Sequence, residues 1–196
     1  MLAFAAAVFF LIITPGPGVL STAGVGSAYG FRPGLKYVLG LMIGTNLVAL
    51  AVVSGLAAIL FADDRIRTIL LWASAAYLAY LAFRIAFAGA KIAFIHRATA
   101  PGVMGGILLQ TINPKAYAVN TTFFTGFPLA EMSFSAEITL KFLIMNAIWL
   151  PIHLGWLWAG VALHQLNLAP RTQRAINIAM ALSMLAVVAL AALAQI

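Results

Sequence analysis

The chain has 196 residues, of which 64% are hydrophobic and only 8% are charged, and its mean hydropathy is +1.08. A soluble domain carries about 25% charged residues and could not bury this much apolar sequence, so the composition excludes that class. The net charge of +7 comes from short loops and forms no basic stripe, which argues against nucleic-acid binding. The absence of cysteine excludes disulfides and thiolate metal sites.

Six stretches of the chain are long and apolar enough to span a membrane, which takes about 20 residues. They run over Leu2–Tyr29, Tyr37–Ala62, Thr68–Ala88, Gly102–Phe127, Ala136–Gln165 and Arg174–Ala194. The first stretch is interpreted as a mature helix and not as a signal peptide. No basic residue opens it, and Pro15 and Pro17 interrupt any cleavage site. We therefore predict an all-α membrane protein with a single transmembrane domain over residues 1–196.

Turn-forming and capping residues separate these segments. Asp63 and Asp64 are predicted to cap the third segment, because aspartate accepts hydrogen bonds from the free amides at a helix start. The other connections contain glycine, proline or asparagine: Gly30–Gly34, Gly89–Pro101 with His96, Phe127–Pro128 and Asn167–Thr172. None of these loops is long enough to hold a second domain.

Lysine and arginine are unevenly distributed between the two sets of loops. Loops one, three and five hold Arg32, Lys36, Lys91, Arg97, Arg171 and Arg174. Loops two and four hold Arg65, Arg67 and Lys141. Because Lys and Arg are enriched in cytoplasmic loops, six spans place both termini outside.

Prolines interrupt two of the apolar segments at a similar depth. The first interruption is Thr14-Pro15-Gly16-Pro17-Gly18, and the second is Asn113-Pro114-Lys115. Proline removes a backbone donor and clashes with the preceding turn, and in lipid the freed groups need partners. A pair of broken helices at corresponding positions is typical of a transporter with its substrate site near the bilayer midplane.

The spacing of the two halves indicates an internal repeat. Pro15 and Pro114 are 99 residues apart, and Asn46 and Asn146 are 100 apart. Each half, about 1–88 and about 102–196, contains three spans. Because three is an odd number, the second half is inverted in the membrane relative to the first, as in many transporters.

The chain resembles the LysE/RhtB family of bacterial amino-acid exporters. The residues that carry the resemblance are Thr14-Pro15-Gly16-Pro17, Gly40-Leu41-Met42-Ile43-Gly44, Ala76 to Leu81, Gly105-Gly106, and Asn113-Pro114-Lys115-Ala116. The resemblance implies an inner-membrane permease that exports amino acids or their derivatives, driven by the proton gradient. Two positions depart from the family pattern: Gly18 stands where asparagine is usual, and Thr45-Asn46 stands where many members carry an acid.

Lys115 is the most informative single residue, because it lies beside a helix break in a segment without a carboxylate. An ionisable residue at this depth is a functional candidate: it can bind a substrate carboxylate or change its protonation. The alternative is structural, with Lys115 bonding the carbonyls that Pro114 frees or snorkelling to the interface. At the other break, the start of the second half-helix exposes amides that favour an anion.

Other polar residues complete the predicted site. The substrate-binding candidates are Thr14, Pro15, Gly16, Pro17, Asn46, Asn113, Pro114, Lys115 and Asn146. Lys115 and His153 are the proton-coupling candidates, since the ordinary pKa of histidine lies near neutrality. For the asparagines, hydrogen bonds between helices are the alternative role, and for His153 it is that of a core histidine with satisfied hydrogen bonds.

Two absences narrow the function. The four acidic residues, Asp63, Asp64, Glu131 and Glu137, all fall in loops or at segment ends, whereas a buried site for a cation needs an anion. We therefore expect a neutral, zwitterionic or anionic substrate. No catalytic or metal-binding motif occurs, so neither an enzyme nor a cofactor is predicted. An intramembrane enzyme, a cofactor carrier and a non-transporting subunit are the rival classes.

Small residues predict close helix packing. Gly40 and Gly44 form a GxxxG motif, and Gly26 and Gly30 form another. Such motifs let two helices approach closely, either within one chain or at a homodimer seam. Packing within the chain is the favoured use. The predicted partners are a small-molecule substrate and the lipid bilayer, with a homodimer as the alternative use of these motifs.

Overall fold

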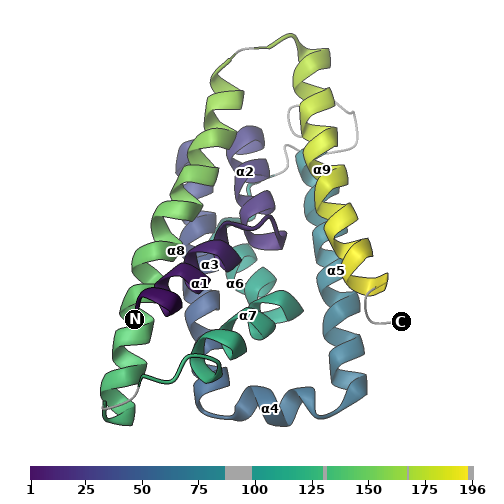
Figure 1. Cartoon of the computed structure of the whole chain (residues 1–196). Helices are drawn as coiled ribbons and strands as arrows, with labels where there is room; N and C mark the ends of the chain where they lie inside the picture. The colour runs from purple at the N-terminus through teal and green to yellow at the C-terminus, as the bar shows by residue number, and fades with distance from the viewer. Residues whose placement is uncertain (87–98, 130–131, 167, 194–196) are drawn as a thin grey trace.

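A computed structural model describes residues 1–86, 99–129, 132–166 and 168–193, and all regular structure in these ranges is helical. In chain order the helices are α1 Leu2–Ile13, α2 Pro17–Tyr29, α3 Phe31–Val53, α4 Leu56–Phe61, α5 Asp64–Ala86, α6 Gly102–Ile112, α7 Pro114–Thr125, α8 Phe134–Gln165 and α9 Pro170–Leu193. The long helices form an upright bundle, with α4 lying across its lower end on the same side as both termini (Figure 1). The predicted loop residues Lys91, His96, Arg97, Glu131 and Asn167, and the predicted segment ends Ala88 and Ala194, lie outside the described ranges.

Both predicted helix breaks are present. α1 ends at Ile13 and α2 starts at Pro17 after an extended Gly16, and the two helices are bent by 51°. α6 ends at Ile112, Asn113 is extended, and α7 starts at Pro114. In each case proline stands at the first helical position, where its missing amide costs nothing.

The second predicted segment differs from the helix that forms. We expected Tyr37–Ala62, but α3 runs over Phe31–Val53 and the separate helix α4 follows. Two glycines set these limits: Gly30 has φ +80° and Gly55 has φ +78°. A left-handed residue ends one helix and starts the next in a new direction, and glycine adopts this conformation without strain. Asp63 accepts a hydrogen bond from the Arg65 amide at 2.7 Å, so its predicted capping role is confirmed.

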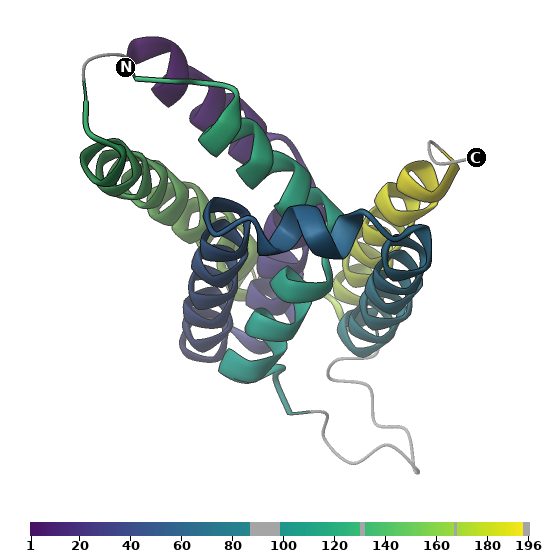
Figure 2. The same ribbon diagram turned by 90° about the horizontal axis from the view of Figure 1, so that it is seen from below.

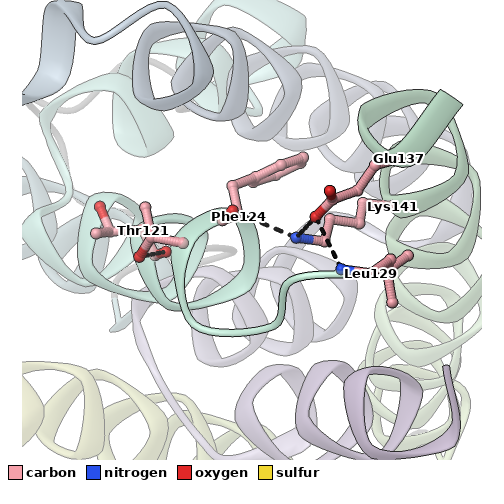
Figure 3. A network of polar contacts seen from close by, with 6 residues as sticks. Thr121, Phe124, Leu129, Glu137 and Lys141 are labelled. Atoms are coloured by element: carbon pink, nitrogen blue, oxygen red, sulfur yellow. Dashed lines mark hydrogen bonds and ion pairs between the residues drawn. The ribbon is translucent and has the colours of Figure 1, made fainter. Parts of the chain in front are cut away.

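Lys141 is not a loop residue as predicted but lies inside α8 with its side chain fully buried. Its Nζ is 2.6 Å from Glu137 Oε1 and donates to the Phe124 carbonyl at 3.3 Å. The same Glu137 oxygen accepts from the Leu129 amide (Figure 3). A buried charge needs a partner, and the i,i+4 spacing on one helix supplies it. The cluster joins the end of α7 to the start of α8.

The helices include several that are long enough to cross a membrane. Among the described residues, α3, α5 and residues Phe134–Leu163 of α8 pass on length and hydropathy, and the bent pair α1–α2 makes a fourth candidate span. α6 is apolar but shorter. The chain is therefore a multi-pass helical protein, while the six-span inverted repeat stays a prediction.

Two glycine-lined crossings close the bundle at the end away from α4. A Cβ on Gly40 of α3 would lie 1.9 Å from the Val103 carbonyl oxygen of α6. A Cβ on Gly160 of α8 would lie 2.1 Å from the Ala23 carbonyl oxygen of α2. The first GxxxG motif therefore serves packing within the chain, because only glycine permits such backbone approach. α5 and α9 form a third pair, visible side by side in Figures 1 and 2.

Candidate functional site

The two helix breaks meet in space, although they are far apart in the sequence. α1 and α7 lie side by side and antiparallel, with the Phe4 and Phe123 rings 6.0 Å apart near one end. At the other end, Lys115 Nζ donates to the carbonyl oxygen of Thr14 at 3.2 Å. The contact joins the first residues after one break to the last residue before the other.

A small cavity, with about 70 Å³ open to water-sized molecules, lies at this junction. Polar and glycine residues from both breaks line it: Thr14, Gly16, Pro17, Gly18, Thr45, Gln110, Asn113, Lys115, Asn120 and His153. The apolar part of the wall is Leu11, Ile12, Val19, Ala116, Val119, Phe123, Met145 and Trp149.

Lys115 is half-buried and reaches across the cavity because residue 16 is glycine. A Cβ on Gly16 would lie 2.7 Å from Lys115 Nζ, so any larger residue would displace the ammonium group. The acceptor, Thr14, caps the C-terminal end of α1, where the helix dipole favours a cation. Lys115 thus satisfies a carbonyl that the end of α1 leaves free, and it keeps donors for a ligand, since an ammonium has three.

A chain of side-chain hydrogen bonds holds the second break in place. Asn113 Oδ1 accepts from the Lys115 backbone amide at 3.1 Å and so caps α7. Asn113 Nδ2 donates to Gln110 Oε1 at 3.3 Å, and Gln110 Nε2 donates to Thr45 Oγ1 at 2.6 Å. The chain fixes the orientation of both amides and links α7 and α6 to α3.

His153 is buried on α8 and faces α2. Its Nδ1 lies 3.0 Å from the Trp149 carbonyl oxygen, and its ring stacks on the Trp149 ring with centroids 3.5 Å apart. Because a carbonyl can only accept, Nδ1 carries a proton, and in neutral histidine Nε2 is then the acceptor. A Cβ on Gly18 would lie 3.5 Å from this Nε2 and 4.0 Å from Gln110 Nε2, so Gly18 leaves the ring nitrogen open to the cavity.

Asn46 and Asn146 lie outside the cavity wall and bond to each other. Each Nδ2 donates to the partner's Oδ1 at 2.9 Å. Each also donates its second proton to the carbonyl four residues earlier in its own helix, Met42 for Asn46 and Phe142 for Asn146. The two residues, 100 apart in sequence, therefore make matching hydrogen bonds on α3 and α8, as the predicted repeat would require.

A second cavity, with about 630 Å³ open to water-sized molecules, lies beside α4 and reaches Lys115 from the other side. Its wall comes from α3, α4, α5 and α7 and includes Arg67, Pro114 and Tyr117. Lys115 and Arg67 are its charged residues, and Arg67 pairs with Asp64. Lys115 thus stands between the inner cavity and a wide, positively charged vestibule.

The structure sorts the predicted site residues into three groups. Thr14, Gly16, Pro17, Asn113, Lys115 and His153 share the inner cavity. Pro114 faces the vestibule, and Pro15 is exposed outside both cavities. Asn46 and Asn146 pair nearby. Sequence reasoning missed Gln110, whose signal was a lone amide three residues before Asn113 in an apolar segment.

A family model described as LysE type translocator matches residues 9–195, which is nearly the whole chain. The chain belongs to the LysE type translocator family. Comparison with curated proteins and with solved structures finds no significant match. Members of this family are transporters and not enzymes, so this LysE type translocator is a multi-pass membrane protein that acts on a small-molecule substrate.

Proposed function

We propose that this protein exports amino acids or amino-acid derivatives across the bacterial inner membrane, as a secondary transporter coupled to the proton gradient. The observation that carries the proposal is the contact of Lys115 with Thr14, because it places a cation in a cavity between two broken helices. Helix breaks at membrane depth are tolerated only where they are buried or line a wet cavity.

The charges of the cavity favour a substrate with a carboxylate. Lys115 is the only charged residue in its described wall, and Gly18 and Val19 supply the first free amides of α2 beside it. Cation and helix start both attract an anion. With no carboxylate in the described wall, a substrate of net positive charge would lose hydration without compensation.

Protons and substrate share one cavity in this proposal. Lys115 and His153 are the groups that can change protonation there, and both line the same wall. Binding of the proton and of the substrate is then coupled in both directions. If a bound proton changes the affinity for the substrate, a bound substrate changes the affinity for the proton by the same factor. Where a bound proton lowers the affinity for the substrate, this coupling supports the exchange of an inward-moving proton for an outward-moving substrate.

The structure is closed at one end and open at the other. The glycine crossings of α3 with α6 and of α2 with α8 close the end away from α4, while the vestibule opens beside α4. With both termini outside, the open end faces the exterior. The proposed inverted repeats would exchange these roles during transport, with Asn46 and Asn146 as the central contact between them.

Export of a panel of labelled amino acids, measured in cells with and without the protein, tests the function. Lys115→Ala should lower efflux of any exported member by about 10- to 100-fold, the value of a charged hydrogen bond. Lys36→Ala removes an exposed lysine from α3 and is the matched control. If Lys115→Ala is inserted at the normal level and retains wild-type efflux, the carboxylate-binding role is refuted.

A further inference from the structure

Asn120 carries an unsatisfied oxygen into the cavity. Among the described residues, its Oδ1 is the one buried side-chain oxygen or nitrogen without a hydrogen-bond partner, and the residue is only 3% exposed. An unpaired buried acceptor is costly, so a native structure keeps one where something else binds it. Asn120 lines the inner cavity, but the proposed function assigns its side chain no role.

The direction of the Asn120 amide follows from its own helix. The side-chain atom that faces the Ala116 carbonyl oxygen lies 2.7 Å from it. A carbonyl only accepts, so this atom is the donor Nδ2, and Oδ1 is the atom left without a partner. Asn120 shares the buried face of α7 with Ala116 and Phe123, and all three line the inner cavity.

Asn120 and Lys115 offer opposite chemistry to one ligand. Lys115 donates and is cationic, whereas Asn120 Oδ1 only accepts. Asn120 lies five positions after Lys115 on α7, and both side chains line the same cavity. One zwitterionic ligand in that cavity can therefore bind Lys115 with its carboxylate and Asn120 with its ammonium group. The rings of Phe123 and Trp149 in the same wall also favour a cation.

We propose that Asn120 Oδ1 accepts a hydrogen bond from the substrate's α-ammonium group, so that the site selects zwitterionic amino acids over acids without that group. The inference rests on the proposed function. It narrows the substrate from any carboxylate to one with a donor at a fixed distance from the carboxylate. Lys115 then binds the carboxylate of the substrate, and Asn120 binds its α-ammonium group.

Counterflow in proteoliposomes with matched probes tests the assignment. One probe is L-leucine, and the other is 4-methyl-2-oxopentanoate, which has the same side chain and carboxylate but an acceptor in place of the ammonium group. Alanine and phenylalanine with their 2-oxo acids extend the comparison to smaller and larger side chains. The wild-type protein should prefer the amino acids by about tenfold or more.

Three variants separate recognition from folding. Asn120→Leu, of similar volume, should lower amino-acid counterflow by about tenfold and leave the 2-oxo acids unchanged, so that the preference is lost. Asn120→Asp keeps the acceptor and should retain the preference. Thr122→Val, on the exposed side of α7, should behave as wild type.

The outcomes distinguish this inference from the function on which it rests. If the folded Asn120→Leu variant still prefers amino acids over 2-oxo acids, Asn120 Oδ1 does not bind the ammonium group. Counterflow that depends on sodium in the wild-type protein but not in that variant would equally overturn the assignment, because Oδ1 would then be a cation ligand. If the wild-type protein moves none of the six probes above empty liposomes, the amino-acid function fails for this panel before Asn120 is tested.

Discussion

At the scale of single residues, two glycines decide what the cavity can hold. Gly16 and Gly18 are two positions apart, yet a Cβ on them would meet different neighbours. At Gly16 the neighbour is the ammonium group of Lys115 at 2.7 Å, and at Gly18 it is His153 Nε2 at an ordinary contact distance of 3.5 Å. A side chain at Gly18 therefore fits, whereas one at Gly16 displaces the cation.

Gly18→Asn should change substrate preference and leave stability almost unchanged. The new amide would reach His153 Nε2 and Gln110 from a position where its Cβ meets no clash, so it can take up the cavity space without unfolding α2. The panel of labelled amino acids and the thermal midpoint of purified protein measure the two effects. An unchanged export profile would place residue 18 outside the binding volume.

At the scale of helices, the close crossings depend on the absence of a side chain at particular positions. α8 contains two glycines with opposite surroundings. Gly160 meets the backbone of α2, and Gly155 has nothing within 4 Å of its would-be Cβ. A neighbouring backbone cannot move aside as a side chain can. Replacement of glycine by alanine is therefore expected to affect stability in opposite directions at these two positions of α8.

Gly160→Ala should destabilise the protein by about 1–3 kcal/mol, because the new methyl group would push α8 away from the Ala23 carbonyl. Gly155→Ala should be neutral or stabilising by about 0.5–1 kcal/mol, because alanine favours helix more than glycine does. Thermal unfolding in detergent, followed by size-exclusion chromatography, compares the pair. Equal stability of the two variants would mean that α2 and α8 do not cross as closely as described.

At the scale of the whole molecule, the placement of charge determines orientation. Lys141 lies inside α8 and no longer counts among the loop lysines and arginines. Arg65 and Arg67 are then the basic residues of the second loop, at the end of the bundle that holds α4. Arg32 and Lys36 start α3, and Arg171 lies in the first turn of α9, at the opposite end. The correction therefore strengthens the charge bias behind the predicted orientation, in which the termini and α4 lie outside.

Single cysteines in this cysteine-free chain should report that orientation. Ala62→Cys, exposed beside α4, is expected to react with a membrane-impermeant maleimide on spheroplasts. Thr172→Cys, exposed at the start of α9, should react only after the membrane is opened. The reverse labelling pattern would invert the topology and turn the open vestibule toward the cytoplasm.

The sequence by itself determined the features that depend on neighbouring residues. Apolar length predicted the helical segments, of which α3, α5, α8 and the bent pair α1–α2 pass as candidate spans. Pro15, Pro17 and Pro114 predicted the breaks, because proline geometry acts within a few turns. The start of α3 at Phe31 was missed, since Pro33 is tolerated in a first turn once Gly30 has turned the chain.

Only the tertiary structure decided which polar groups meet. Asn46 and Asn146 had two predicted roles, ligand contact and hydrogen bonding between helices, and the structure shows the two side chains bonded to each other. Lys141 has Glu137 as its partner inside α8. The unpaired oxygen of Asn120 and the reach of Lys115 to Thr14 likewise depend on where other helices lie. A hydrogen bond is satisfied or not by atoms within about 3 Å, and segments 100 residues apart in sequence come that close only after packing.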